Sequence, residues 1–155
     1  MIASLFAVLL LQTAPAAAAP VCTATVAPPA GLEAWSSAPG MTADAIPPGK
    51  TIALTLQPID SVTLLPLPRK PAPGTFGGVY HVTIATAGTY RVALQNAGWI
   101  DLVRDGKSLT SVGHMEGPTC SGIRKIVDFA LQPGTYTLQL SGAKTPQMRI
   151  LIAAK

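Results

Sequence analysis

The side chains in this sequence that best match a known catalytic arrangement are its two histidines and one nearby carboxylate. The histidines are His81 and His114, and Glu116 lies two positions after His114. Two histidines and one carboxylate are the ligand set of non-haem iron oxygenases, which leave coordination positions open for reactants. The sequence therefore allows a small enzyme that holds a single transition metal on His81, His114 and Glu116.

The surrounding sequence favours a non-catalytic protein instead. His81 alternates with apolar neighbours, so we expect it on the solvated face of a strand. His114 and Glu116 lie in a polar segment, residues 113–118, that is typical of a loop. No Gly-x-Ser-x-Gly nucleophile motif is present, and neither cysteine has a second cysteine nearby for a redox pair. As the main hypothesis we therefore expect no catalytic residues and no cofactor.

A binding role has better candidates, because two tryptophans and one aspartate lie in or beside turns. Trp99 and Asp101 follow the polar turn at residues 95–98, and Trp35 lies in a proline-rich segment. Aromatic side chains and constrained loops commonly carry binding on rigid β-sandwiches. Each tryptophan has an alternative role, Trp99 in the core and Trp35 as an anchor of its segment. The loop at residues 111–121 completes the expected binding surface, and the expected partner is an envelope protein or a glycan.

Charge argues against nucleic acid as that partner. Only 12% of the residues are charged, the formal net charge is +4, and the basic residues form no run of four or more. Nucleic-acid surfaces usually combine a dense basic stripe with interleaved aromatic residues. Neither feature is present in this sequence.

The N-terminus predicts export. Residues 1–11 are almost wholly apolar and residues 12–19 are small or polar, which is the pattern of a secretory signal peptide over residues 1–19. The apolar run is shorter than the roughly 20 residues that a membrane span needs. No later segment is long and apolar enough to span a bilayer, so we expect a periplasmic or secreted protein without a transmembrane segment.

The two cysteines, Cys22 and Cys120, are expected to form a disulfide, since two cysteines in an oxidising compartment make a bond the simplest arrangement. A lipid anchor on Cys22 is the alternative. On the chain-entropy model, closing a loop of nearly the whole domain stabilises the fold by about 4–5 kcal/mol.

Residues 51–155 are predicted to form one antiparallel, jelly-roll-like β-sandwich of about eight or nine strands, with the proline-rich residues 20–50 as an arm packed on it. Two glycine turns are each followed by a strand with Tyr and Leu on one face, at residues 87–94 and 133–140, and we expect two hairpins there. Asp105-Gly106 predicts a further hairpin. The other expected strands span residues 51–56, 61–65, 79–85, 99–104, 107–110, 123–131 and 147–153.

These motifs together resemble the bacterial pre-peptidase C-terminal domain over roughly residues 76–153. The resemblance rests on Gly-Thr-Tyr at residues 88–90 and 134–136, and on the Asp101-containing strand that ends at Asp105-Gly106. It implies a small β-sandwich of the kind usually appended to secreted proteases and other exported enzymes. It also implies a calcium site beside the central strand, for which this chain offers Asp101 with Asp105 nearby.

A second resemblance accompanies the histidines. His81, His114 and Glu116 are similar in type to the metal ligands of homogentisate 1,2-dioxygenases, which implies iron as the cofactor. Those enzymes are several times longer, and their cupin motifs are not visible in this sequence.

Overall fold

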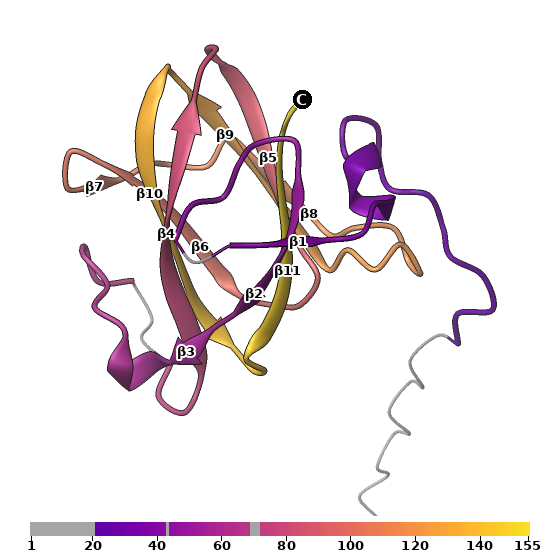
Figure 1. The fold of residues 1–155 in the computed structure, drawn as a ribbon, viewed down its shortest axis with the longest axis horizontal. Coiled ribbons are helices and arrows are strands. Elements are labelled where there is room, and N and C mark those ends of the chain that lie inside the picture. Colours follow the sequence, from indigo (N-terminus) through magenta and orange to yellow (C-terminus); the bar gives the residue numbers. More distant parts are fainter. Residues whose placement is uncertain (1–20, 43, 69–71) are drawn as a thin grey trace, which may run out of the picture.

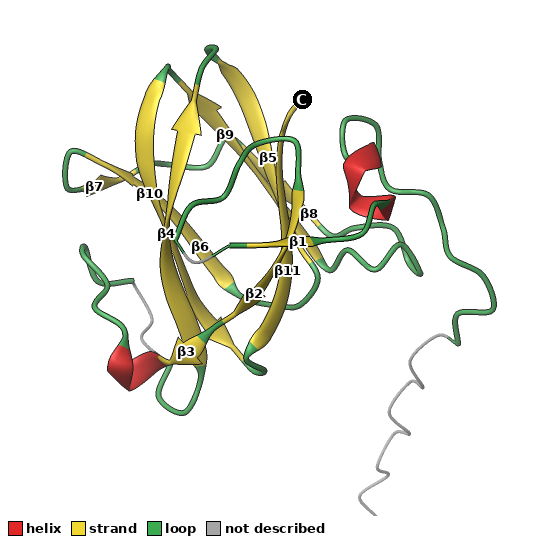
Figure 2. Cartoon of the chain, in the orientation of Figure 1, coloured by secondary structure: helices red, strands yellow, loops and turns green. Residues whose placement is uncertain are grey.

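The computed structural model of the protein describes residues 21–42, 44–68 and 72–155, and the expected signal peptide lies outside these residues. Within these ranges eleven strands form two sheets that pack face to face (Figures 1 and 2). Two short 3-10 helices, η1 (Glu33–Ser36) and η2 (Ile59–Ser61), are the helical segments of this part of the chain. No helix in the described ranges has the length and apolar character that crossing a membrane requires. The strands are β1 (Gly40–Met41), β2 (Thr51–Thr55), β3 (Gln57–Pro58), β4 (Phe76–Ile84), β5 (Gly88–Leu94), β6 (Trp99–Arg104), β7 (Lys107–Ser108), β8 (Gly113–Met115), β9 (Lys125–Leu131), β10 (Gly134–Ala143) and β11 (Gln147–Ala154).

The strand order is β1-β2-β11-β5-β9-β8 in one sheet and β3-β4-β10-β6-β7 in the other. Neighbouring strands are antiparallel except for β1 and β2. The inward residues are apolar at every second position, as in β4, where Tyr80, Val82 and Ile84 are buried. Such side chains from both sheets form one core, which confirms the prediction of an antiparallel β-sandwich.

The prediction of hairpins at the two similar glycine turns was wrong. The turn before Gly88 carries the chain from β4 in the five-stranded sheet to β5 in the six-stranded sheet, and the turn before Gly134 leads back from β9 to β10. After the turns, β5 pairs with β9, so that Gly88 lies opposite Leu131. Likewise β10 pairs with β4, so that Gly134 lies opposite Ile84. The two connections therefore lie side by side at one end of the sandwich (Figure 1).

The repeated tyrosine has the same role in both connections. The hydroxyl of Tyr90 donates a hydrogen bond to the carbonyl of Thr86 at 2.9 Å, and that of Tyr136 donates to the carbonyl of Gln132 at 2.8 Å. Each tyrosine thus buries its ring in the core and fixes the chain four residues upstream. This local arrangement is compatible with a hairpin and with a connection between sheets, which is why periodicity alone gave the wrong pairing.

The number of strands is also larger than the expected eight or nine. The additional elements contain only two or three residues, as in β1, β3 and β8, and so are too short to show a period-two pattern. The predicted strand at residues 61–65 is absent. That segment is irregular, with Leu64 buried and the Leu65 amide bonded to the Gln139 side chain at 2.6 Å.

The proline-rich segment packs on the outer face of the six-stranded sheet. Leu32 and Trp35 are buried there in a second, smaller core that includes Ala93, Ile126 and Leu151. This outer face is apolar at the points that the segment covers, so β5, β9 and β11 have buried residues on both faces. A disulfide between Cys22 and Cys120, with Cα atoms 5.5 Å apart, fixes the start of the segment.

Candidate binding groove

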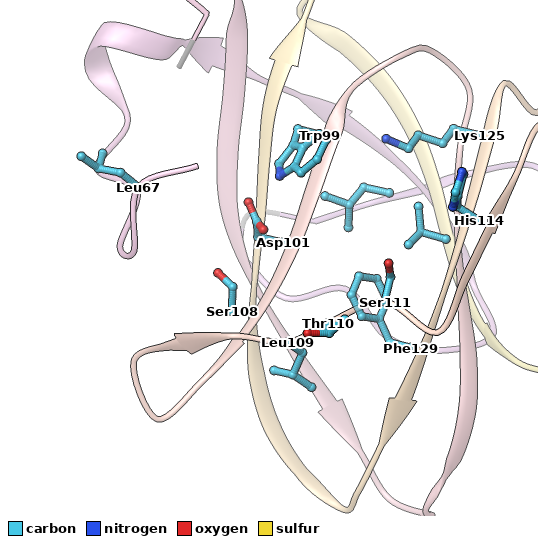
Figure 3. Close-up of a pocket in the computed structure, with 12 residues that line it drawn as sticks. Leu67, Trp99, Asp101, Ser108, Leu109, Thr110, Ser111, His114, Lys125 and Phe129 are labelled. Carbon is cyan, nitrogen blue, oxygen red and sulfur yellow. The ribbon is translucent and has the colours of Figure 1, made fainter. Parts of the chain in front are cut away.

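A groove of about 610 Å³ lies between β6 of one sheet and β8–β9 of the other (Figure 3). Its presence follows from the path of the chain after β6. The Leu109 amide still bonds to the Leu102 carbonyl beside β6 at 2.7 Å, whereas the Val112 amide bonds to the Asp128 carbonyl on β9 at 2.8 Å. The intervening residues 110–111 therefore cross from one sheet to the other, and the side of the sandwich next to this crossing stays open.

The groove combines an apolar floor with polar and charged walls. Its lining residues come from β6 to β9 and from the segment before β4, and they are Leu67, Trp99, Ile100, Asp101, Ser108, Leu109, Thr110, Ser111, His114, Lys125, Val127 and Phe129. Such a mixture, in which a few polar groups converge on an apolar surface, is typical of binding sites.

Trp99 is the largest exposed side chain of the groove. Because β6 alternates, Ile100 and Leu102 point into the core, whereas Trp99 and Asp101 lie on the outer face of the sheet. Trp99 is 47% exposed, so it is not a residue of the core, which was the alternative role. The Lys125 ammonium lies 5.3 Å from the centre of the indole ring and donates a hydrogen bond to the Gly98 carbonyl at 2.8 Å. A cation at this distance from an indole is attracted to the ring face.

Asp101 and Lys125 are held in an environment that disfavours their charged forms. Burial raises the pKa of Asp101 above its ordinary value, and a hydrogen bond from Trp99 and the charge of Lys125 offset this effect only in part. Burial likewise lowers the pKa of Lys125, with Asp101 acting in the opposite direction. Titratable groups whose charge is disfavoured in this way are concentrated at functional sites. The two groups therefore mark this groove as the best candidate site in the described residues.

This environment predicts that Asp101→Asn raises the stability of the protein at neutral pH. The folded protein binds the Asp101 proton more tightly than the unfolded chain does, so wild-type stability falls as pH rises from the ordinary value of 3.8 through the raised pKa. We expect the variant to be more stable than wild type at pH 7 and equally stable at pH values below 3.8. Urea unfolding of both proteins across this range measures the difference. Asp105→Asn, at an exposed turn, is the charge-matched control, and an equal effect of both substitutions would contradict the prediction.

The structure does not bring together the three candidate metal ligands of the alternative hypothesis. His81 lies exposed on β4, and His114 lies on β8 of the other sheet, where it lines the groove. Glu116 forms an ion pair with Arg124, with the Oε1 and Nη1 atoms 2.7 Å apart. Among the residues that the structure describes, no three His, Cys, Asp or Glu side chains are placed to hold a metal ion together.

Trp35 lies away from the groove. It is 3% exposed, and the Arg149 guanidinium lies 4.9 Å from the centre of its ring. Its position on the outer face of the six-stranded sheet is that of an anchor for the segment around η1.

Lys125 is the charged groove residue that the sequence-based prediction missed. The sequence contained a sign of its position, because Lys125 lies two and four residues before Val127 and Phe129 and so on the same face of β9 as these core residues. A lysine on an apolar face is unusual in a β-sandwich and points to an opening of the core at that position.

Comparison with solved structures finds a similarity to the pre-peptidase C-terminal domain of collagenase from Bacillus anthracis. The TM-score is 0.44, the sequence identity is 13%, and the match covers 76% of this chain and 98% of that one. This is the domain type that the sequence motifs resemble. No protein-family model and no curated protein matches the sequence.

Proposed function

We propose that this protein is an exported, non-catalytic β-sandwich that binds a partner in the periplasm or cell envelope through the groove at Trp99. The observation that carries the proposal is the half-exposed Trp99 ring, held by β6 beside Asp101 and Lys125 at the mouth of an apolar groove. Rigid strands present these side chains, so little conformational entropy is lost when a ligand contacts them.

The proposed compartment has two supports. The first is the signal-peptide pattern of residues 1–19, and the second is the Cys22–Cys120 disulfide. Disulfides persist in oxidising compartments and are rare in the cytosol of most cells.

The proposal predicts that Trp99→Ala abolishes most of the binding and leaves the fold intact. Central aromatic residues of binding surfaces often contribute 2 kcal/mol or more, which corresponds to an affinity loss of roughly 30-fold. The half-exposed ring contributes less to folding, and we expect unfolding to change by less than about 1 kcal/mol. A glycan array and quantitative capture from an envelope extract, each with wild type and variant, measure the binding.

Met41→Ala is the matched control for this experiment. Met41 is 90% exposed on β1, which lies at the opposite edge of the six-stranded sheet from β8. Binding that is lost equally in both variants, or that is retained in Trp99→Ala, would place the ligand surface elsewhere.

A further inference from the structure

The edge of β6 that borders the groove has unpaired backbone groups. On this side, β7 pairs only with Val103 and Arg104, and one further bond reaches the Leu102 carbonyl. Backbone groups of alternate strand residues point to the same side, so the N–H and C=O of Ile100 point toward the groove like those of Leu102. In the described part of the chain, no backbone or side-chain group is hydrogen-bonded to Ile100 on this side.

The corresponding edge on the other side of the five-stranded sheet is covered. There an extended piece of the N-terminal segment lies beside β4, where the Ile46 amide bonds to the His81 carbonyl at 2.8 Å and the His81 amide bonds to the Asp44 carbonyl at 2.7 Å. A short extended chain thus already completes one edge of this sheet. Ile100 offers the same kind of pairing at the opposite edge, where none of the residues that the structure describes forms such a piece.

We propose that the groove binds an extended peptide segment of a partner protein, which pairs with Ile100 as an added strand and inserts one apolar side chain between the sheets. The inserted side chain would contact Leu109, Val127 and Phe129, which line the groove beside the edge. This inference rests on the proposed function, because it names the chemical class of the ligand that the same groove takes. Addition of a strand to an exposed edge is a common mode of peptide recognition.

The charges of the groove specify the peptide further. The Lys125 ammonium has three N–H donors, and one bonds to the Gly98 carbonyl. Lys125 and His114 line the β8–β9 wall, whereas Asp101 lies on the β6 side, so an acidic side chain that faces the β8–β9 wall would find a donor there. The net charge of +4 also favours an acidic partner. Lys125 lies over one face of the Trp99 indole ring, which leaves a sugar only the other face for stacking.

The test begins with selection of a displayed library of short linear peptides on the full protein. The selected peptide is then synthesised as a series in which one backbone nitrogen at a time is methylated. Only one peptide N–H can donate to the Ile100 carbonyl, so we expect methylation to weaken binding by roughly tenfold or more at that one position and much less at its neighbours. Trp99→Ala should also weaken the binding, whereas Met41→Ala should not.

Hydrogen exchange of single amides supplies a second readout. Peptide binding should slow exchange of the Ile100 amide at least about tenfold and leave the Asp101 amide, which faces β10, unchanged. Failure to select any peptide, absence of a single methylation-sensitive position, or unchanged exchange at Ile100 would each overturn the inference. Glycan binding that depends on Trp99 would overturn it as well, yet would leave the proposed binding function standing.

Discussion

Replacing Trp35 by alanine should lower the free energy of unfolding by about 3–5 kcal/mol, the range measured when a large buried aromatic side chain is truncated. Trp35 is 3% exposed and packs in the second core with Leu32, Ile126 and Leu151. Its removal leaves a cavity between the segment around η1 and the six-stranded sheet. The Arg149 guanidinium, 4.9 Å from the centre of the ring, loses its aromatic contact at the same time.

Trp35→Ala should also loosen the segment around η1, beyond the loss of core contacts. Its backbone is held by Arg149, which donates to the Ser37 carbonyl at 2.6 Å, and by Thr51, whose hydroxyl donates to the Ala34 carbonyl at 2.6 Å. These bonds require the geometry that the buried Trp35 ring imposes on η1. We therefore expect amides of residues 32–37 to exchange faster in Trp35→Ala than those of β10.

Guanidinium unfolding at equilibrium measures this prediction, and Trp99→Ala is the matched control. Both variants remove the same side chain, from a site 3% exposed in one case and 47% exposed in the other. We expect the midpoint to fall much further for Trp35→Ala. Similar midpoints for the two variants would contradict the anchoring role of Trp35.

The parts of the fold that could be predicted from the sequence are those with long alternating strands. In β4, three buried residues alternate with exposed ones, and burial of one face fixes the register of such a strand. Strands of two or three residues, such as β1 and β8, depend on the paths of their neighbours and carry no pattern of their own. The crossing between sheets at the two glycine turns also escaped prediction, because pairing over long sequence distances decides it.

The candidate site was only partly predictable for a related reason. The pair Trp99 and Asp101 was found from residue type and its place after a turn. Whether Trp99 is buried or exposed depends on how far β7 extends along β6, since a longer β7 would cover that edge. His114 was assigned to a possible metal site, yet the strand pairing of β8 places it in the wall of the groove. The sequence thus identified candidate residues by type, but only the fold shows which of them lie together in the groove.

Removing the disulfide should lower the free energy of unfolding by about 2–5 kcal/mol. The bond joins residues 98 positions apart in a chain of 155, so it closes a long loop in the unfolded state. In the folded protein it holds the N-terminal segment beside the loop before β9, where the Val26 amide also bonds to the Cys120 carbonyl at 3.0 Å. The variant to measure is the double substitution of Cys22→Ala and Cys120→Ala, since a single substitution would leave a free thiol.

Wild-type protein unfolded with and without a reductant is the control for this experiment. Reduced wild type and the double variant should unfold at the same denaturant concentration, below that of the oxidised protein. Cys120 has a φ of 66°, and both cysteine and alanine carry a Cβ, so the substitution adds no new backbone strain. Equal midpoints for oxidised and reduced protein would show that the bond does not stabilise the fold.

Neither cysteine lines the groove, so peptide binding by the folded double variant should match that of wild type. Loss of binding would show that the N-terminal segment influences the groove. Retained binding would show that the disulfide has a structural role only.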